Sequence, residues 1–301
     1  MTFHRQIQRR DFIRGIGALG VAAATLPAQA LAAPFSFVHG VASGDPLADR
    51  VVIWTRITTP QDNPVAVMWE VAADEDFRRV LRRGRVLATS ARDHTVKVDV
   101  AGLPADARLW YRFSVGQMFS PVGRTRTLPT GHVERLDLAV FSCANYPAGY
   151  FHAHGEAAKL DHVFASVHLG DYLYEYPRGG YASRDAAALG REVLPAGELT
   201  VLSDYRQRYA QYRTDPDLQA LHARMPMIAV WDDHEIANDT WKGGAENHDP
   251  ATEGDFMARR AAAIQAYHEW MPTRVTNPAR PELIYRSFTF GDLVSLHMLD
   301  T

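Results

Sequence analysis

The chain of 301 residues has little cysteine, no long apolar run and no large excess of either charge. A single cysteine excludes an internal disulfide. The weakly apolar stretch from Ile16 to Leu26 is too short to be a permanent membrane anchor, and nothing after it resembles a membrane span. A formal net charge of −3 gives no reason to expect nucleic-acid binding through a basic face. With 47% hydrophobic and 22% charged residues, the composition is typical of a globular protein with ample material for a core.

The N-terminus carries the pattern of an export signal. The twin-arginine pattern Arg9-Arg10-Asp11-Phe12-Ile13-Arg14 is followed by the apolar stretch and then by small residues suited to signal peptidase, at Ala28-Gln29-Ala30 or Ala30-Leu31-Ala32. Because these features occur in the right order, they favour a signal peptide over residues 1–33 rather than an amphipathic helix of the mature protein. We therefore expect export by the twin-arginine machinery and a periplasmic or secreted protein.

Residues 35–130 have the signals of an all-β domain. Short β-branched or aromatic runs are separated by Pro, Gly and Asp clusters. Gly102-Leu103-Pro104 ahead of Trp110-Tyr111 resembles the turn and tyrosine corner of an immunoglobulin-like sandwich. Residues 128–132, which include a proline and a glycine, are predicted to be a linker. The predicted strands are 51–55, 65–71, 94–100 and 110–115.

Residues 136–301 alternate strand and helix patterns, which predicts a mainly parallel sheet covered on its faces. Asp215 before Pro216 is a good N-cap, and Thr252 stands three residues before Asp255 as a capping-box variant. The segment 177–200 lacks periodicity and is expected to be a surface insertion near a site. The predicted helices are 150–160, 202–212, a short one after 215 and one from about 255 to 270.

Three apolar runs end abruptly in polar residues. The first leads into Ser142-Cys143-Ala144-Asn145, the second into Gly170-Asp171-Tyr172-Leu173-Tyr174-Glu175, and the third into Trp231-Asp232-Asp233-His234-Glu235. Buried parallel strands bring their carboxyl ends to one edge of a sheet. Oxygen, nitrogen and sulfur donors at three such ends predict a polynuclear metal site.

The donor types indicate which metal fits. Asp171 and Tyr174 are close enough in a tight turn to face one ion, and phenolate favours ferric iron; the alternative is an ordinary turn with Tyr174 in the core. Cys143 as thiolate would add negative charge, unless it is a buried structural cysteine. The Asn145 amide lies on the same side of an extended segment and could bind substrate or metal.

The third motif concentrates acids around one imidazole. His234 could be a ligand, a partner of a ligand or a proton donor. Three acids beside it, Asp232, Asp233 and Glu235, are difficult to explain without a cation, since unpaired buried carboxylates are costly.

Together these motifs resemble a known family. Residues 37–46 (FVHGVASGDP) and 52–56 (VIWTR) look like the opening of the N-terminal domain of the alkaline phosphatase D (PhoD-like) family. Residues 141–145, 169–175 and 231–235 look like three motifs of its metallophosphatase domain. The resemblance implies an immunoglobulin- or fibronectin-like sandwich at 35–130, followed at 136–301 by a calcineurin-like α/β metallophosphatase domain. It also implies an exported phosphomonoesterase or phosphodiesterase that uses iron with calcium.

Motif by motif, the resemblance implies a role for each residue. Cys143 stands at the position of the first metal ligand, Asp171 at that of the bridging carboxylate, and Tyr174 at that of the iron-binding phenolate. Asp233 would bind the second ion, and His234 would assist the phosphate or leaving group. Asn145 is a candidate catalytic residue, and Asp232, Glu175 and Glu235 are expected just outside the ligands.

The expected mechanism is in-line attack on phosphorus by a metal-activated water, since no serine in these motifs has an evident base beside it. Calcium would take carboxylate oxygens, and iron the thiolate and phenolate. The chain ends directly after the apolar run 293–299, whereas family members continue, so we expect a piece lacking later histidine ligands, with negligible hydrolysis by itself. The alternative is a non-catalytic protein that binds phosphate esters or a surface.

Overall fold

The computed structural model describes residues 35–300, so the signal peptide predicted at 1–33 lies outside the described residues. Three parallel strands position the polar strand ends: β9 (Leu138–Phe141), β10 (Ala165–His168) and β11 (Met227–Ala229). Every residue of β10 and β11 is buried, as expected of parallel strands covered on both faces. The predicted apolar runs therefore form strands, and all three end at the same edge of the sheet.

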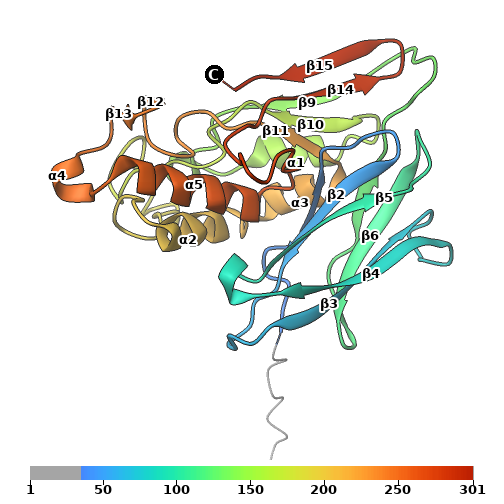
Figure 1. Cartoon of the computed structure of the whole chain (residues 1–301), viewed down its shortest axis with the longest axis horizontal. Helices are drawn as coiled ribbons and strands as arrows, with labels where there is room; N and C mark the ends of the chain where they lie inside the picture. Colours follow the sequence, from blue (N-terminus) through green and yellow to red (C-terminus); the bar gives the residue numbers. More distant parts are fainter. Residues whose placement is uncertain (1–34, 301) are drawn as a thin grey trace, which may run out of the picture. The chain divides into compact units, whose positions relative to one another are not determined.

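This sheet continues into the N-terminal region (Figure 1). β1 (Val41–Gly44) pairs in parallel with β11, and two antiparallel strands, β2 (Arg50–Arg56) and β5 (Thr95–Ala101), extend it to the order β5-β2-β1-β11-β10-β9. At the junction Gly44 faces Met227, where an added Cβ would lie 2.5 Å from the Met227 carbonyl oxygen. Only glycine lets the two strands approach this closely.

A second, antiparallel sheet lies in the N-terminal region. Its core face contributes to a cluster of buried side chains shared with β1, β2 and β5, which includes Ile53, Val67 and Phe113. The predicted strands 51–55, 65–71, 94–100 and 110–115 are confirmed, but the tyrosine corner is wrong, because the buried Tyr111 hydroxyl makes no hydrogen bond to residues 35–300. The strands, in spatial order, are β4 (Val80–Ala88), β3 (Val65–Ala72), β6 (Arg108–Val115) and β7 (Met118–Phe119), with β8 (Gly123–Arg126) also on β6.

The helices agree closely with the sequence prediction. The Asp215 carboxylate accepts hydrogen bonds from the Asp217 and Leu218 amides, which confirms the predicted cap. The Thr252 prediction is wrong: Asp255 itself caps the following helix through the Ala258 amide, and Thr252 belongs to a separate short helix. The helices are α1 (His152–Ala158), α2 (Leu202–Tyr212), α3 (Pro216–Arg224), α4 (Pro250–Glu253) and α5 (Phe256–Trp270). Figure 1 shows α2 beside α5.

The remaining elements are short. β14 (Arg286–Phe290) and β15 (Val294–Met298) form a hairpin, and β12 (Thr240–Trp241) and β13 (Gly244–Ala245) form a smaller one. The 3-10 turns are η1 (Ser90–Arg92) and η2 (Tyr146–Ala148). The segment 177–200 contains no helix or strand, as predicted. Across the part of the chain that the structure describes, no helix is long and apolar enough to cross a membrane.

Candidate metal centre

Backbone hydrogen bonds fix the loops after β9 and β10 to each other. The Cys143 amide donates to the Gly170 carbonyl at 3.2 Å, and the Ala144 amide donates to the Asp171 carbonyl at 2.8 Å. Cys143 and Asp171 both have positive φ, at 61° and 55°. Such a conformation is unfavourable for residues with a side chain, and it persists only where the surroundings hold it. The two candidate ligands are thus held in strained, defined positions.

Gly170 allows the third loop to approach. Its φ is +109°, and an added Cβ would lie 2.4 Å from the backbone nitrogen of Asp232. No other residue type fits both the conformation and this contact. The glycine before Asp171 therefore brings the loop after β11 against the loop after β10.

Three candidate ligands meet at one carboxylate oxygen. The Cys143 Sγ lies 3.4 Å from Asp171 Oδ2, and the Tyr174 hydroxyl lies 3.2 Å from the same atom. Ser142 Oγ lies 3.1 Å from the Cys143 sulfur. The exposed Cys143 is not the buried structural cysteine of the alternative interpretation. Thiol, phenol and carboxylate from two loops therefore converge on one point.

The third loop adds an imidazole and a second carboxylate. One ligand atom from each of Asp171, Asp233 and His234 lies within 4.8 Å of the other two. His234 Nδ1 lies 2.8 Å from a Glu175 oxygen, and its ring packs 4.2 Å from that of Tyr174. With Nδ1 engaged by Glu175, Nε2 is the nitrogen left to face a ligand or substrate.

Two buried glutamates organise these loops. Glu235 accepts the amides of Asp171, Tyr172 and Asp232, at 3.0, 2.6 and 2.9 Å, and so joins the loops after β10 and β11. Burial raises the pKa of Glu235 to about 8, against the effect of these donors. Glu175 is fully buried and, besides His234, accepts the Asn238 amide at 2.7 Å.

The electrostatics of the centre fit a bound cation. Burial raises the pKa of Asp171, and the nearby Asp233 and Asp232 raise it further. Burial and the Asp171 charge also raise the pKa of Tyr174. Within residues 35–300 none of the three aspartates forms an ion pair with Lys or Arg. Asp171 Oδ1 is buried without a hydrogen-bond partner, so the chain leaves an anionic atom for a cation to bind.

Asn145 lies at the edge of this centre. Its Nδ2 donates weakly to the Tyr181 carbonyl at 3.4 Å, and its buried Oδ1 has no partner in the described chain. An open cleft of about 450 Å³ runs from Cys143 and Asn145 along α1 to His154. The Tyr181 ring also stacks on Tyr174 at 6.0 Å, so the 177–200 insertion borders the site, as the sequence suggested.

The sequence motifs therefore locate the residues that the fold brings together. Sequence reasoning missed Asn247, whose amide donates to Glu175 at 2.8 Å, and Tyr181 of the insertion. Neither follows one of the three buried apolar runs or stands in a recognisable spacing, so no local signal could have indicated them. Asp232 is exposed, beside the ligands rather than among the closest group.

Comparison with known proteins identifies relatives over nearly the whole chain. A family model described as PhoD-like phosphatase matches residues 138–301, and one described as its N-terminal domain matches residues 21–129. Alkaline phosphatase D of Bacillus subtilis (strain 168) is 41% identical, over 97% of this chain and 53% of the relative. A solved structure of PhoD superposes with a TM-score of 0.80 at 40% identity, covering 88% of this chain and 52% of that one. The chain thus spans about half the length of these relatives.

Proposed function

We propose that this chain, which belongs to the PhoD-like phosphatase family, carries the metal-binding part of an exported phosphoric ester hydrolase of the alkaline phosphatase and phosphodiesterase type. The observation that supports it best is the convergence of Cys143 and Tyr174 on Asp171 Oδ2, with Asp233 and His234 beside them. A phosphate ester is the small-molecule substrate that the relative's name suggests.

The donor set suits two kinds of cation. Cys143 and Tyr174 offer thiolate and phenolate, which suit ferric iron, and Asp171 and Asp233 offer carboxylate oxygens, which suit calcium. Bound there, such ions would act as Lewis acids and generate a nucleophilic hydroxide near neutral pH. Asp171, central to both groups, would hold the site together.

His234 is placed to act on the leaving group. Burial alone would lower its pKa, but the hydrogen bond and negative charge of Glu175 outweigh burial and raise it. The imidazole is therefore kept protonated to higher pH, with Nε2 as the proton donor. A proton delivered to the departing ester oxygen would neutralise its developing charge.

Asn145 would orient the phosphate. Its partnerless Oδ1 and weakly bonded Nδ2 leave capacity for a ligand at the mouth of the cleft. An amide N–H aimed at a phosphate oxygen would bind without adding charge.

The proposal extends to fold and location. The two sheets around the N-terminal core support an immunoglobulin- or fibronectin-like sandwich at 35–130, and the strand-end site supports a calcineurin-like domain at 136–301. Residues 1–33 would be the twin-arginine signal of a periplasmic or secreted protein, as their sequence suggests.

Metal content tests this function independently of turnover. We expect the purified chain to retain iron, counted by mass spectrometry of the metal, and to show a visible charge-transfer band that Tyr174→Phe shifts or abolishes. Tyr150→Phe, at an exposed tyrosine that lines the same cleft, is the matched control and should leave the band unchanged. An iron-loaded Tyr174→Phe protein with an unaltered spectrum would remove Tyr174 from the site. In a protein extended to the length of the relatives, we expect metal-dependent hydrolysis of p-nitrophenyl phosphate or its bis ester. Ester binding without turnover would support a binding protein instead.

A further inference from the structure

The edge strand of the five-stranded sheet, with the turn before it, carries a cluster of arginines that the net charge of the chain does not reveal. Five of the eight residues from Arg78 to Arg85 are arginine, in a chain with net charge −3. All five are exposed. Arg82, Arg83 and Arg85 lie on β4, which forms the edge of the sheet order β4-β3-β6-β7, and the other two arginines lie just before it.

Strand register shows which arginines share a face with apolar side chains. Arg85 stands opposite Met68, Met68 opposite Ser114, and Ser114 opposite Phe119, which makes one row across all four strands. Directly paired residues point to the same face of a sheet. Leu87 lies two residues beyond Arg85 and therefore also points to this face.

These apolar side chains are open to solvent. Met68 is 43% exposed, Phe119 51% and Leu87 55%. The outer side of an antiparallel sheet is normally polar, and isolated exposed apolar residues need no explanation. Here three of them lie together with arginine. We call this surface of Met68, Arg83, Arg85, Leu87 and Phe119 the outer face.

The charges of the outer face are mostly unneutralised. In the adjacent row Arg83 stands opposite Glu70, but Glu70 pairs with Arg112 at 2.8 Å instead. Within residues 35–300, Arg83 and Arg85 form no ion pair. The Arg112 guanidinium carbon lies 4.0 Å from the centre of the Phe77 ring and 4.5 Å from that of the Phe119 ring, so Arg112 contacts the exposed Phe119.

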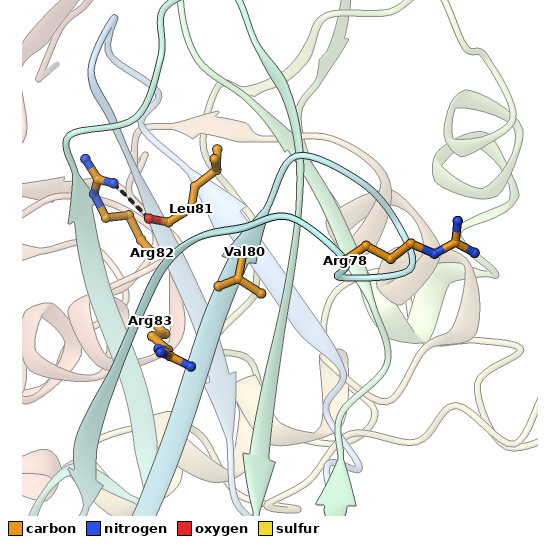
Figure 2. Close-up of a pocket in the computed structure, with 5 residues that line it drawn as sticks. All are labelled: Arg78, Val80, Leu81, Arg82 and Arg83. Atoms are coloured by element: carbon orange, nitrogen blue, oxygen red, sulfur yellow. Dashed lines mark hydrogen bonds between the residues drawn. The ribbon is translucent and has the colours of Figure 1, made fainter.

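The N-terminal end of β4 provides a basic hollow. It has a volume of about 440 Å³ and is lined by Arg78, Val80, Leu81, Arg82 and Arg83. Figure 2 shows Val80 between Arg78 on one side and Arg83 on the other, with Leu81 beside Arg82. Arg82 is partly engaged, since its Nη1 donates to the Leu81 carbonyl at 2.8 Å. Arginine is well suited to bidentate contacts with phosphate oxygens.

We propose that the outer face docks the protein onto the surface of an anionic phospholipid bilayer. The arginines would contact lipid phosphates, and Met68, Leu87 and Phe119 would enter the boundary between headgroups and acyl chains. Protection of an edge strand explains charges on β4, but not the exposed apolar side chains beside them. A soluble polyanion would use the arginines and gain little from the apolar groups.

Vesicle binding by the full chain tests this. At low salt we expect sedimentation with vesicles of 70% phosphatidylcholine and 30% phosphatidylglycerol, and far less with phosphatidylcholine alone. The variant Arg83→Gln/Arg85→Gln should lower the partition coefficient about thirtyfold, from the usual contribution of each basic residue near an anionic membrane. Lys159→Gln/Arg184→Gln removes the same charge from exposed positions elsewhere and should change it little. Residues 1–34 are identical in all these proteins, so the differences report the outer face.

A second pair of substitutions separates lipid from other polyanions. Met68→Ser/Leu87→Ser should weaken vesicle binding about tenfold. Three results would overturn the proposal: equal binding by the arginine variant and its control, equal binding to both vesicle compositions, or undiminished binding at 1 M salt, where the Debye length is about 3 Å. Binding of inorganic polyphosphate unaffected by Met68→Ser/Leu87→Ser, without vesicle binding, would also overturn it.

Discussion

The metal centre concentrates negative charge on several loops, whereas the outer face carries positive charge on one sheet. At the centre, Asp171 and Asp233 form no ion pair with Lys or Arg among residues 35–300, and hydrogen bonds from backbone amides to Glu235 hold the loops in place. On the outer face, Arg83 and Arg85 project from one regular sheet, and their positions follow from strand register alone. Charged side chains that are brought close together must be positioned by contacts between distant parts of the chain. Charged side chains on the surface of a sheet are positioned by their own strand. The centre should therefore be easy to damage and the face easy to alter.

The largest effect should come from Asp171. Asp171→Ala removes the carboxylate on which thiol and phenol converge, so we expect loss of bound metal and essentially all turnover. Metal analysis and ester hydrolysis measure it. Asp161→Ala removes an exposed carboxylate and should leave both unchanged. Near-normal metal content in Asp171→Ala would contradict the expected difference, because the metal centre would then tolerate substitution as well as the outer face does.

Gly170→Ala should have the second-largest effect. The alanine Cβ meets the Asp232 nitrogen at a positive φ, so we expect destabilisation of about 3 kcal/mol, seen in the free energy of unfolding by urea. Gly179 also has a positive φ, but it has no atom within 4 Å of an added Cβ. Gly179→Ala should therefore cost about 1 kcal/mol. Equal costs at the two positions would show that the close contact of the loops contributes nothing.

Glu175→Gln tests the support around the centre. Glutamine keeps the shape but weakens the acceptor for His234 Nδ1, so metal affinity or turnover should fall roughly 10- to 100-fold. The pKa of His234 should fall as well, because Glu175 contributes most to raising it, ahead of Asp171 and Asp233. The alkaline limb of the pH profile and the NMR titration of His234 report this shift. An unchanged profile would leave Glu175 with a packing role only.

The buried His39 should make the stability of the fold depend on pH. Burial, with the charges of Arg56 and Arg213, lowers the pKa of His39 to about 3, while the unfolded chain titrates near 6.5. The unfolded state thus binds more protons, so this stability is present above pH 6.5 and is lost as pH falls toward 3, at about 1.4 kcal/mol per unit. Thermal unfolding of His39→Gln between pH 7 and 5 should show a shallower pH dependence. His152→Gln, an exposed histidine, should keep the original slope.

The smallest effect should be on the outer face. Arg83→Gln/Arg85→Gln should change the free energy of unfolding by no more than about 0.5 kcal/mol, because neither side chain has a partner among residues 35–300. Urea titration measures this. A loss above 2 kcal/mol would mean that the arginines stabilise the fold, and the contrast with the centre would fail.

The sequence predicts those parts of the structure that leave a local pattern, and not those that depend on tertiary contacts. The three strand ends could be found because buried strands are continuous apolar runs and their ligands follow at once, as in Trp231 to Glu235. The edge strand β4 could not be predicted in this way, because its arginines interrupt the alternation of apolar and polar residues that is typical of a half-buried strand. The contact between Asn247 and Glu175 spans 72 positions and depends on tertiary folding alone. The domains and the roles of the site residues remain predictions.

The continuous sheet from β5 to β9 also limits how the chain can be divided. β1, β2 and β5 precede the apparent linker at residues 128–132, whereas β9, β10 and β11 follow it. The buried Asp45–Arg286 pair, at 2.8 Å, ties the same two parts together. Cutting at the linker would expose the β11 edge and leave Arg286 without its counter-charge, which favours aggregation. In protein engineering, a domain swap at this linker should fail, and the two regions should be exchanged between relatives only as one module.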